Sequence, residues 1–360
     1  MNKSISTLSS TVFCGIDVSA KSLAVSVIEL DGAVSQREFA NSASGHKALA
    51  AWLGKHNARV RVSLEATGIY SLDLALALDA EAHIELAVLN PRLVNRFAET
   101  LRRSKTDAAD AMVLAEYSLR MPLIAWQRPG IEQLRLRGIS RYIESLVVDL
   151  AEVKNRLQAA ARASTTPRAV IADLNKAQAA LLRRVAKMRL EAMKLVQAED
   201  GLRERFRLLV SAPGIAEVSA LQILSELIVL APTLNVRQWV AYSGLDPVHQ
   251  ESGTSVHKPS RISRAGNRHL RRALYMPALS AARYDPHMRA FYQALRARHK
   301  TGLQALMAVA RKNAARHLWH LQKRHTLRRS TAVSEYPDRG RINRRVKRKR
   351  ALLGSNHAEG

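Results

Sequence analysis

The first 120 residues switch repeatedly between two hydrophobic periodicities, and this switching limits the fold more than any other feature of the chain. Apolar residues alternate with polar ones in five short stretches, which predicts strands. Elsewhere in this region the apolar residues recur every three to four positions, which predicts helices. The resulting order indicates an α/β domain in which a mixed sheet has helices on both faces. The predicted strands are two within 12–30, then 33–39, 59–65 and 84–89, and the predicted helices are 42–56, 71–79, 92–103 and one from 107.

Four acidic residues occupy special positions in this pattern. Asp17 ends the first predicted strand and Glu65 ends the fourth, so their carboxylates lie side by side if these strands are neighbours. Asp107 and Asp110 begin a predicted helix, and their spacing of three places both on one face. Thr106 suits the N-cap of that helix. Carboxylates this close repel one another unless a cation lies between them, and a divalent metal ion is the natural candidate.

Each of these acids also has an ordinary structural explanation. Asp107 complements the positive end of the helix dipole, and Asp110 is then a solvated residue of the first turn. Asp17 and Glu65 are in that case surface acids at strand ends. The DxxD spacing alone favours the ordinary explanation, whereas four acids at related topological positions favour a metal site.

The chain carries a large excess of positive charge. Its 360 residues include 57 Lys and Arg against 30 Asp and Glu, a net charge of +27, which indicates a polyanionic partner such as nucleic acid. Aromatic residues make up only 5%, which argues against base stacking as the main binding mode. A single cysteine, Cys14, excludes an intrachain disulfide and a Cys-based zinc site. Neither a run of about 18 apolar residues nor a signal-peptide core is present, so we expect a cytoplasmic, nucleoid-associated protein without membrane contact.

Two long helices are predicted after Pro129-Gly130 closes the first domain. One covers 131–161, and the second follows the break at Thr165-Thr166-Pro167. The second carries a heptad seam with one polar member, Gln178. This seam predicts either an antiparallel hairpin of the two helices or a coiled coil with a second protomer.

The region after residue 200 contains a second centre of candidate chemistry. Residues 208–227 read as helix, Pro-Gly turn and helix, which is typical either of a DNA-binding helix-hairpin-helix or of a plain helix connection. Residues 238–266 read as irregular, and they contain Ser252 beside Gly253. A serine beside a glycine and near arginines suits attack on a phosphodiester. The arginines are predicted to bind nucleic acid, and they are Arg261, Arg264, Arg268, Arg271 and Arg272.

The acids resemble those of ribonuclease-H-fold nucleases, most closely Holliday-junction resolvases of the RuvC type. Such folds gather their acids at one sheet edge to hold two divalent metal ions roughly 4 Å apart for phosphoryl transfer. A sugar-kinase or actin-like ATPase also has an acid after its first strand, but the sequence lacks the second Gly-rich phosphate loop that such an enzyme needs.

Over about residues 10–322 the chain resembles the DEDD transposases of bacterial insertion sequences, the Piv/MooV-like group. The acid half contributes GIDVS, SLEATG and KTDAAD, and the second half contributes PGI, YSGLDP, the SG pair and RAGNRHLRRAL. The resemblance implies a transposase or site-specific recombinase that moves its own element, which some members do under the guidance of an element-encoded bridge RNA. It further implies Mg²⁺ or Mn²⁺ at Asp17, Glu65, Asp107 and Asp110, and a dimer or tetramer.

In this family a serine of the second domain forms a covalent link to DNA, and acids from another protomer complete the site. Ser252 matches that serine, although the sequence reads SGT where SGG is usual. Ser243, Ser255 and Ser263 are nearby rivals. Two other functions stay open: a RuvC-like nuclease in which water attacks, and a non-catalytic nucleic-acid-binding protein.

The predicted organisation has four parts. An α/β RuvC-like domain covers 10–125, a helical hairpin or coiled coil covers 126–200, and a mainly α domain with the candidate serine covers 201–322. The composition changes after that to a strongly basic segment, 323–360, which is predicted to be disordered and to bind the nucleic-acid backbone.

Overall fold

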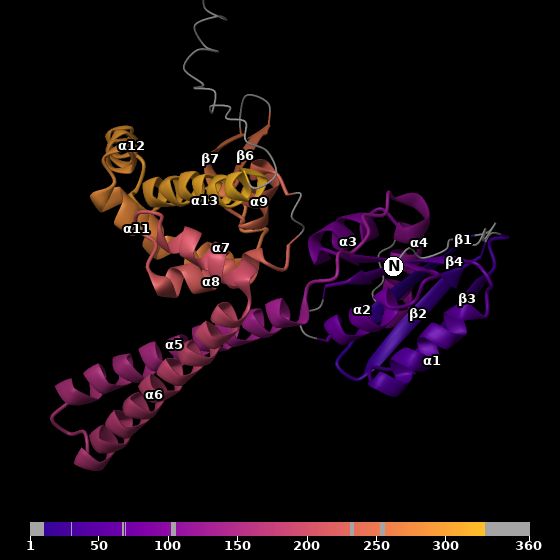
Figure 1. Ribbon diagram of the computed structural model, residues 1–360, viewed down its shortest axis with the longest axis horizontal. Coiled ribbons are helices and arrows are strands. Elements are labelled where there is room, and N and C mark those ends of the chain that lie inside the picture. The colour runs from indigo at the N-terminus through magenta and orange to yellow at the C-terminus, as the bar shows by residue number, and fades with distance from the viewer. Residues whose placement is uncertain are drawn as a thin grey trace, which may run out of the picture.

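The structure, a computed structural model, has an α/β domain, a projecting pair of long helices and a mainly helical C-terminal domain (Figure 1). It describes residues 11–29, 31–66, 68, 70–101, 106–230, 234–252 and 256–327. For 249–252, 256–260 and 317–327 the description covers the backbone.

The N-terminal domain is built on a five-stranded mixed sheet in the order β3-β2-β1-β4-β5. Strands β1, β2 and β3 form an antiparallel meander, and β4 and β5 then continue the sheet in parallel with β1. This arrangement confirms the mixed sheet that was predicted from the alternation. The strands are β1 (Thr11–Val18), β2 (Ser22–Ile28), β3 (Val34–Ala40), β4 (Arg59–Glu65) and β5 (Ile84–Leu89).

Helices cover both faces of this sheet, as predicted. Helices α1 (Ala43–Gly54) and α2 (Leu72–Asp79) bury their leucines against the face that carries Ile16 and Leu64. Helix α4 (Asp107–Arg120) packs on the opposite face, across β1, β2 and β4. The short helix α3 (Pro91–Ala98) lies beside α4, and the ring of Phe97 contacts that of Tyr117.

A row of small residues lets α4 approach the sheet closely. Ser26, Gly15, Ser63 and Ala87 face one another across four neighbouring strands. A Cβ atom on Gly15 would lie 2.1 Å from both the carbonyl oxygen of Ala111 and the amide nitrogen of Ala115. The hydroxyl of Ser118 on the same helix donates to the Cys14 carbonyl at 3.0 Å, and the Ser63 hydroxyl lies 2.7 Å away. The backbone of α4 therefore rests directly on β1.

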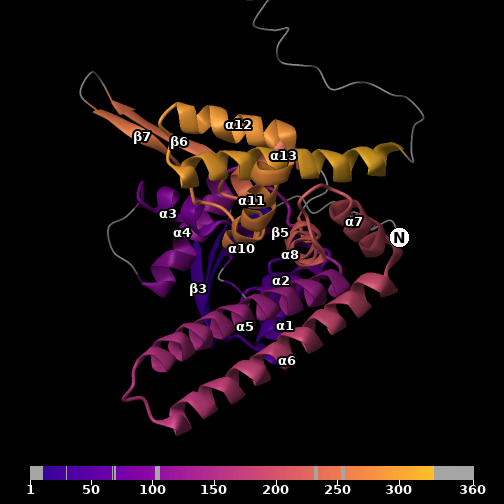
Figure 2. The same cartoon turned by 90° about the vertical axis from the view of Figure 1, so that its left-hand side faces the viewer.

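Two long helices, α5 (Ile131–Arg162) and α6 (Arg168–Ala198), pack on each other as an antiparallel hairpin that projects from the body (Figure 2). Within one chain, α5 and α6 therefore form the antiparallel hairpin, which was one of the two predicted arrangements. Leu146 and Leu150 of α5, together with Leu181 and Val185 of α6, are buried in the shared core. Closer to the tip Leu174 is only partly buried, because two helices alone cannot enclose the seam.

The C-terminal domain is mainly helical and is centred on Trp239. Its ring is fully buried, and its Nε1–H donates to the Ala314 carbonyl at 2.9 Å. The helices are α7 (Asp200–Val210), α8 (Glu217–Leu227), α9 (Val236–Tyr242), α10 (Arg268–Ala273), α11 (Tyr275–Tyr284), α12 (Pro286–Ala297) and α13 (Gly302–Leu327).

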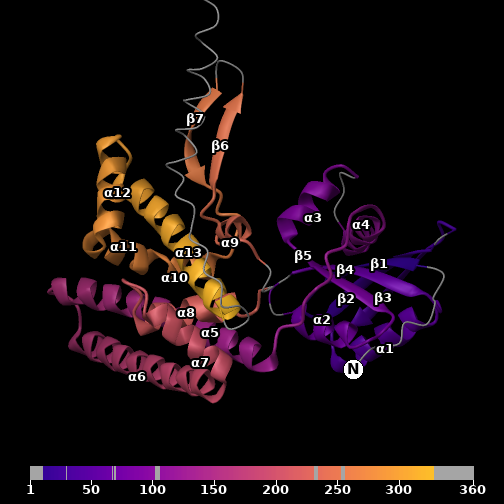
Figure 3. The same ribbon diagram turned by 45° about the horizontal axis from the view of Figure 1, so that its top comes forward.

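Two sequence predictions for this domain differ from the structure. The region expected to be irregular contains a two-stranded hairpin, β6 (Pro247–Ser252) and β7 (Val256–Ile262), which stands away from the helices (Figure 3). The sequence does not show these strands by alternation, because their aliphatic residues are only Val248, Val256 and Ile262 and each strand contains a proline. Helix α13 continues to Leu327, so residues 323–327 of the predicted tail are helical, and 328–360 lie outside the described residues. Within the described part of the chain, no helix is long and apolar enough to cross a membrane.

Replacing Gly15 by alanine tests the close approach of α4. The added Cβ meets helix backbone, which cannot move aside as a flexible side chain would, so Gly15→Ala should lower the free energy of unfolding by about 3 kcal/mol or more. The matched control is Gly138→Ala, an exposed position within α5 where nothing lies within 4 Å of the new Cβ. It should raise the stability by about 0.5–1 kcal/mol through helix propensity. Urea unfolding of the full chain measures both, and equal stability of the two variants would contradict the packing described.

Candidate functional site

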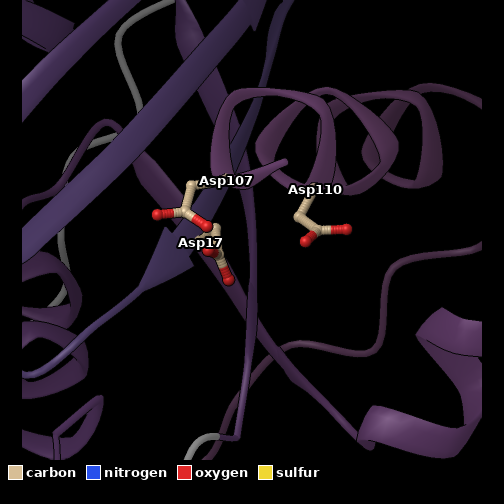
Figure 4. Close-up of side chains that lie close together, drawn as sticks. All are labelled: Asp17, Asp107 and Asp110. Atoms are coloured by element: carbon tan, nitrogen blue, oxygen red, sulfur yellow. The ribbon is translucent and has the colours of Figure 1, made fainter. Parts of the chain in front are cut away.

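Three of the four predicted acids come together at one end of the sheet. One carboxylate oxygen from each of Asp17, Asp107 and Asp110 can be chosen so that all three atoms lie within 4.8 Å of one another (Figure 4). Asp17 and Asp110 are half-buried, and Asp107 is exposed. Three negative charges at this separation need a counter-charge, and an all-oxygen donor set of this kind suits a hard divalent cation.

The geometry of this cluster follows from the elements that carry it. Asp17 lies near the end of β1, on the sheet face that α4 covers. Thr106 caps α4 as expected, since its hydroxyl oxygen accepts a hydrogen bond from Ala109 N at 3.3 Å. The first turn of α4 therefore begins at Asp107, and the tight packing of the helix on Gly15 brings that turn to the end of β1.

Glu65 is the fourth predicted acid, and it lies on the neighbouring strand. Strands β1 and β4 are parallel with Ile16 opposite Leu64, so Glu65 follows at the same step as Asp17. Its side chain is half-buried, and it is not one of the three acids whose oxygens converge. The two strand ends are therefore neighbours, and Glu65 is not among the acids that converge.

Ser252 is the last residue of β6, where it pairs with Val256 of β7. The intervening residues 253–255, which include the rival Ser255, lie outside the described residues. The other two rivals are held in the folded core at the foot of this hairpin. The buried Ser243 hydroxyl donates to the Val240 carbonyl at 2.7 Å, and the Ser263 hydroxyl donates to Asp246 Oδ1 at 2.5 Å.

The foot of the β6–β7 hairpin is built from two of the other C-terminal motifs, YSGLDP and the RAGN of RAGNRHLRRAL. Their backbones run together, since Ser263 N donates to Asp246 O at 2.8 Å and Asn267 N donates to Tyr242 O at 2.5 Å. Gly244 adopts a φ of 66°, and a Cβ on Gly266 would lie 1.9 Å from the Tyr242 carbonyl oxygen. These glycines allow the two segments to touch, which fixes the foot of the hairpin that carries Ser252.

A buried ionic network ties this foot to the helical hairpin. Glu226 of α8 is only 2% exposed and accepts two hydrogen bonds from Arg141 of α5, at 2.7 and 2.9 Å. Asn267 donates to the same carboxylate at 2.5 Å and to the Tyr242 hydroxyl at 3.1 Å. Burial alone would raise the pKa of Glu226, but the hydrogen bonds and charge of Arg141 outweigh it, so the pKa lies below its usual value.

A second contact between the same elements lies one turn further along α5. Glu144 accepts hydrogen bonds from His269 Nδ1 at 2.5 Å and from Arg272 Nη1 at 3.1 Å. Sequence reasoning did not identify Glu226 or Glu144 as important. Each acid lies in an ordinary helix, and its partner is distant in the sequence.

The five predicted nucleic-acid-binding arginines fall into two groups. Arg261, Arg264 and Arg268 are exposed. Arg272 is engaged with Glu144, and Arg271 donates to the Ser243 carbonyl at 3.1 Å. Burial, Arg264 and Arg92 of α3 together lower the pKa of Arg271. The exposed three are the better candidates for phosphate contacts, and the other two serve the hairpin foot.

Replacing Glu226 by glutamine tests the buried network. The variant leaves the Arg141 guanidinium without its buried counter-charge, so the free energy of unfolding should fall by about 2–3 kcal/mol at neutral pH. Because the folded-state pKa of Glu226 is depressed, its contribution is complete above the unfolded value of 4.5 and is lost as the pH falls through the folded value. Urea unfolding of both proteins at neutral pH and below pH 4.5 should show this difference shrinking. A constant difference would contradict the assignment.

Two transposase family models match the sequence. One, of the IS110 DEDD type and described as a transposase, matches residues 14–164, and the other, described as transposase IS116/IS110/IS902 family, matches residues 206–293. The first contains the acid cluster, and the second contains the β6–β7 hairpin and its foot.

Relatives of the chain include the pilin gene-inverting proteins of Moraxella bovis and Moraxella lacunata. Each is 27% identical over 280 residues, which are 76% of this chain and 84% of the relative. An uncharacterized 43.6 kDa protein of insertion element IS110 from Streptomyces coelicolor is 44% identical over 71 residues, 20% of this chain and 17% of that protein. Among solved structures, Thermus thermophilus RuvC aligns with 16% identity and a TM-score of 0.22, over 29% of this chain and 90% of its own. The chain belongs to the IS110/IS116/IS902 family of DEDD transposases.

Proposed function

We propose that this protein cuts and rejoins the DNA ends of its own insertion sequence, with Ser252 as the nucleophile and the DEDD acids as the metal centre. The observation that carries the proposal is the convergence of Asp17, Asp107 and Asp110 at the end of the sheet. The family supports DNA as the substrate, and the net charge of +27 suits it.

Asp17, Asp107 and Asp110 would hold the metal ion, and Glu65 at the adjacent strand end would complete the set. Carboxylate oxygens are the ligands that Mg²⁺ and Mn²⁺ prefer. When bound, such an ion supplies a positive charge that favours a deprotonated nucleophile and offsets the charge of the leaving group.

The protein's own part in the reaction is the serine step. The Ser252 hydroxyl loses its proton and its Oγ forms a bond to phosphorus, while the bond from phosphorus to one deoxyribose oxygen breaks and that oxygen takes up a proton. The phosphoserine link preserves the energy of the phosphodiester. Attack by the free hydroxyl of another DNA end then breaks the Oγ–P bond and restores the serine.

The acid cluster and the β6–β7 hairpin belong to different domains (Figure 3). The proposal therefore includes assembly of a dimer or tetramer in which the acids of one protomer act beside the serine of another. It also includes guidance by an element-encoded RNA, which the positive charge of the chain suits as well as it suits DNA.

A RuvC-like nuclease is the second candidate. One observation favours it: the three converging acids need no group from the C-terminal domain, so they could serve an attacking water without Ser252.

A covalent protein–DNA adduct separates these two functions. The wild-type chain, incubated with the ends of its element, Mg²⁺ and the element-encoded RNA, should yield an adduct that survives denaturing electrophoresis. Ser252→Ala should abolish it, because the attacking oxygen is gone. Ser263→Ala should retain it, because that hydroxyl is bound to Asp246. Cleavage by Ser252→Ala at the wild-type rate would establish water as the nucleophile.

Removal of the metal should stop the reaction before any covalent step. EDTA should abolish the adduct and Mn²⁺ should restore it, whereas Asp107→Asn should lose it in either metal, because one ligand charge is absent. The matched control is Asp73→Asn, since Asp73 is likewise an exposed aspartate in the first turn of a helix of the same domain. It should react as the wild type does, and full activity of Asp107→Asn would remove that residue from the proposed centre.

A further inference from the structure

A cavity of about 530 Å³ lies between the foot of the β6–β7 hairpin and the start of α13. In Figure 2 the two strands approach the first turns of this helix. The wall is mainly apolar, with Leu245 and Ile262 from the hairpin side and Leu303 and Met307 from α13. The volume lies within the range of small-ligand sites in proteins.

The rim of the cavity is strongly basic. Arg261, Arg264, Lys300 and Arg311 line it, all four are exposed, and no acidic residue is among the lining residues. In the described part of the chain no carboxylate forms an ion pair with any of them. Arg141, Arg272 and Arg316 of the same region, by contrast, are each paired with an acid. The four rim cations are therefore left for an external anion.

An apolar wall beneath a basic rim selects one kind of occupant. A phosphate alone satisfies the rim but leaves the wall uncovered, and an apolar peptide covers the wall but leaves the cations unpaired. The basic segment 328–360 and a second copy of this chain, whose net charge is +27, have the wrong sign. A nucleotide whose base has left its stack satisfies both parts, because its ring is largely apolar and its phosphates are anionic.

We propose that this cavity receives an unpaired base of the DNA strand that Ser252 attacks, while the flanking phosphates lie on the basic rim. This inference rests on the proposed recombinase function. At about 3.3 Å per residue, the strand from Pro247 to Ser252 spans about 17 Å. At about 3.4 Å per nucleotide, the unpaired base lies roughly five nucleotides from the attacked phosphate. Thr301 and Gln304 also line the cavity. Their side-chain oxygens accept hydrogen bonds from each other's backbone N–H groups, so the Thr301 O–H and the Gln304 amide N–H groups are the donors offered to the edge of the base.

Holding a base out of its stack serves strand exchange. A DNA end that is to be joined to a new partner must first give up pairing with its old one. A cavity that stabilises one unpaired nucleotide a short distance along the strand from the cut lowers the free energy of that opening.

Equilibrium binding without chemistry tests the inference. The full-length wild-type chain in EDTA is titrated into two fluorescein-labelled DNA duplexes of equal length, one fully paired and one with a single unpaired thymidine. We expect the second duplex to bind on the order of tenfold more tightly. Leu303→Asp should remove this preference, because a carboxylate in the wall repels both the ring and its phosphate.

The matched control is Leu190→Asp, since Leu190 and Leu303 are leucines on helices with 59% and 60% exposure. It should keep the preference. Arg311→Ala should weaken the binding of both duplexes alike and reduce the salt dependence by about one charge.

The inference would be overturned by equal binding of the two duplexes by the wild type, by a preference that survives in Leu303→Asp, or by a stronger preference for the corresponding RNA duplex than for DNA. Displacement of the DNA by an acidic amphipathic peptide in wild type but not in Leu303→Asp would assign the cavity to a protein partner and would also overturn it. This binding assay involves no cleavage, so its result is independent of the adduct assay. A missing adduct with an intact preference for the unpaired duplex counts against Ser252 alone. An adduct without that preference counts against the cavity alone.

Discussion

The contact of α4 with Gly15 is the constraint on which the acid cluster depends. The helix backbone rests on β1 at a distance that leaves no space for a Cβ, and Ser118 secures the same contact near the other end of the helix. With the axis of α4 held in this way, the position of its first turn follows from the cap at Thr106. Asp107 and Asp110 thus meet Asp17 through main-chain packing, whereas loops or long side chains would place them less accurately.

Much of the N-terminal domain was predictable because its strands and helix ends are determined by residues that are close together in the sequence. The alternation in 59–65 and the cap residue Thr106 are read from a few neighbouring positions. The pairing of β1 with β4, which brings Asp17 and Glu65 to adjacent strand ends, was only a condition at the level of the sequence and is supplied by the structure. That Glu65 is not among the converging acids was not predictable, because the spacing of residues does not determine side-chain positions at a strand end.

The C-terminal domain was harder to predict because its irregular segments are held in place by contacts between residues that are far apart in the sequence. The β6–β7 hairpin is supported at its foot by YSGLDP and RAGN, about twenty residues apart in the chain, and both motifs have loop-like composition. The acids that stabilise this foot, Glu226 and Glu144, come from two other helices. The arginine-rich segment illustrates the same limit. Its residues have one composition but divide into cations without an acidic partner among the described residues and arginines bonded to the hairpin foot or to Glu144, and this division appears only when the partners are known.

The clamp of α5 on the C-terminal domain has a mechanical consequence. Arg141 bonds to Glu226, which bonds to the hairpin foot, and Glu144 bonds to His269. Beyond Glu144, α5 continues to Arg162 at the tip of the projecting helix pair. That segment is roughly 27 Å long at the ordinary helical rise. It acts as a lever arm, and the end of this arm at Arg141 and Glu144 is bonded to the foot of the β6–β7 hairpin. A partner that binds the distant tip and tilts it therefore applies a torque to the foot of the β6–β7 hairpin. It does so without contacting the acid cluster or Ser252.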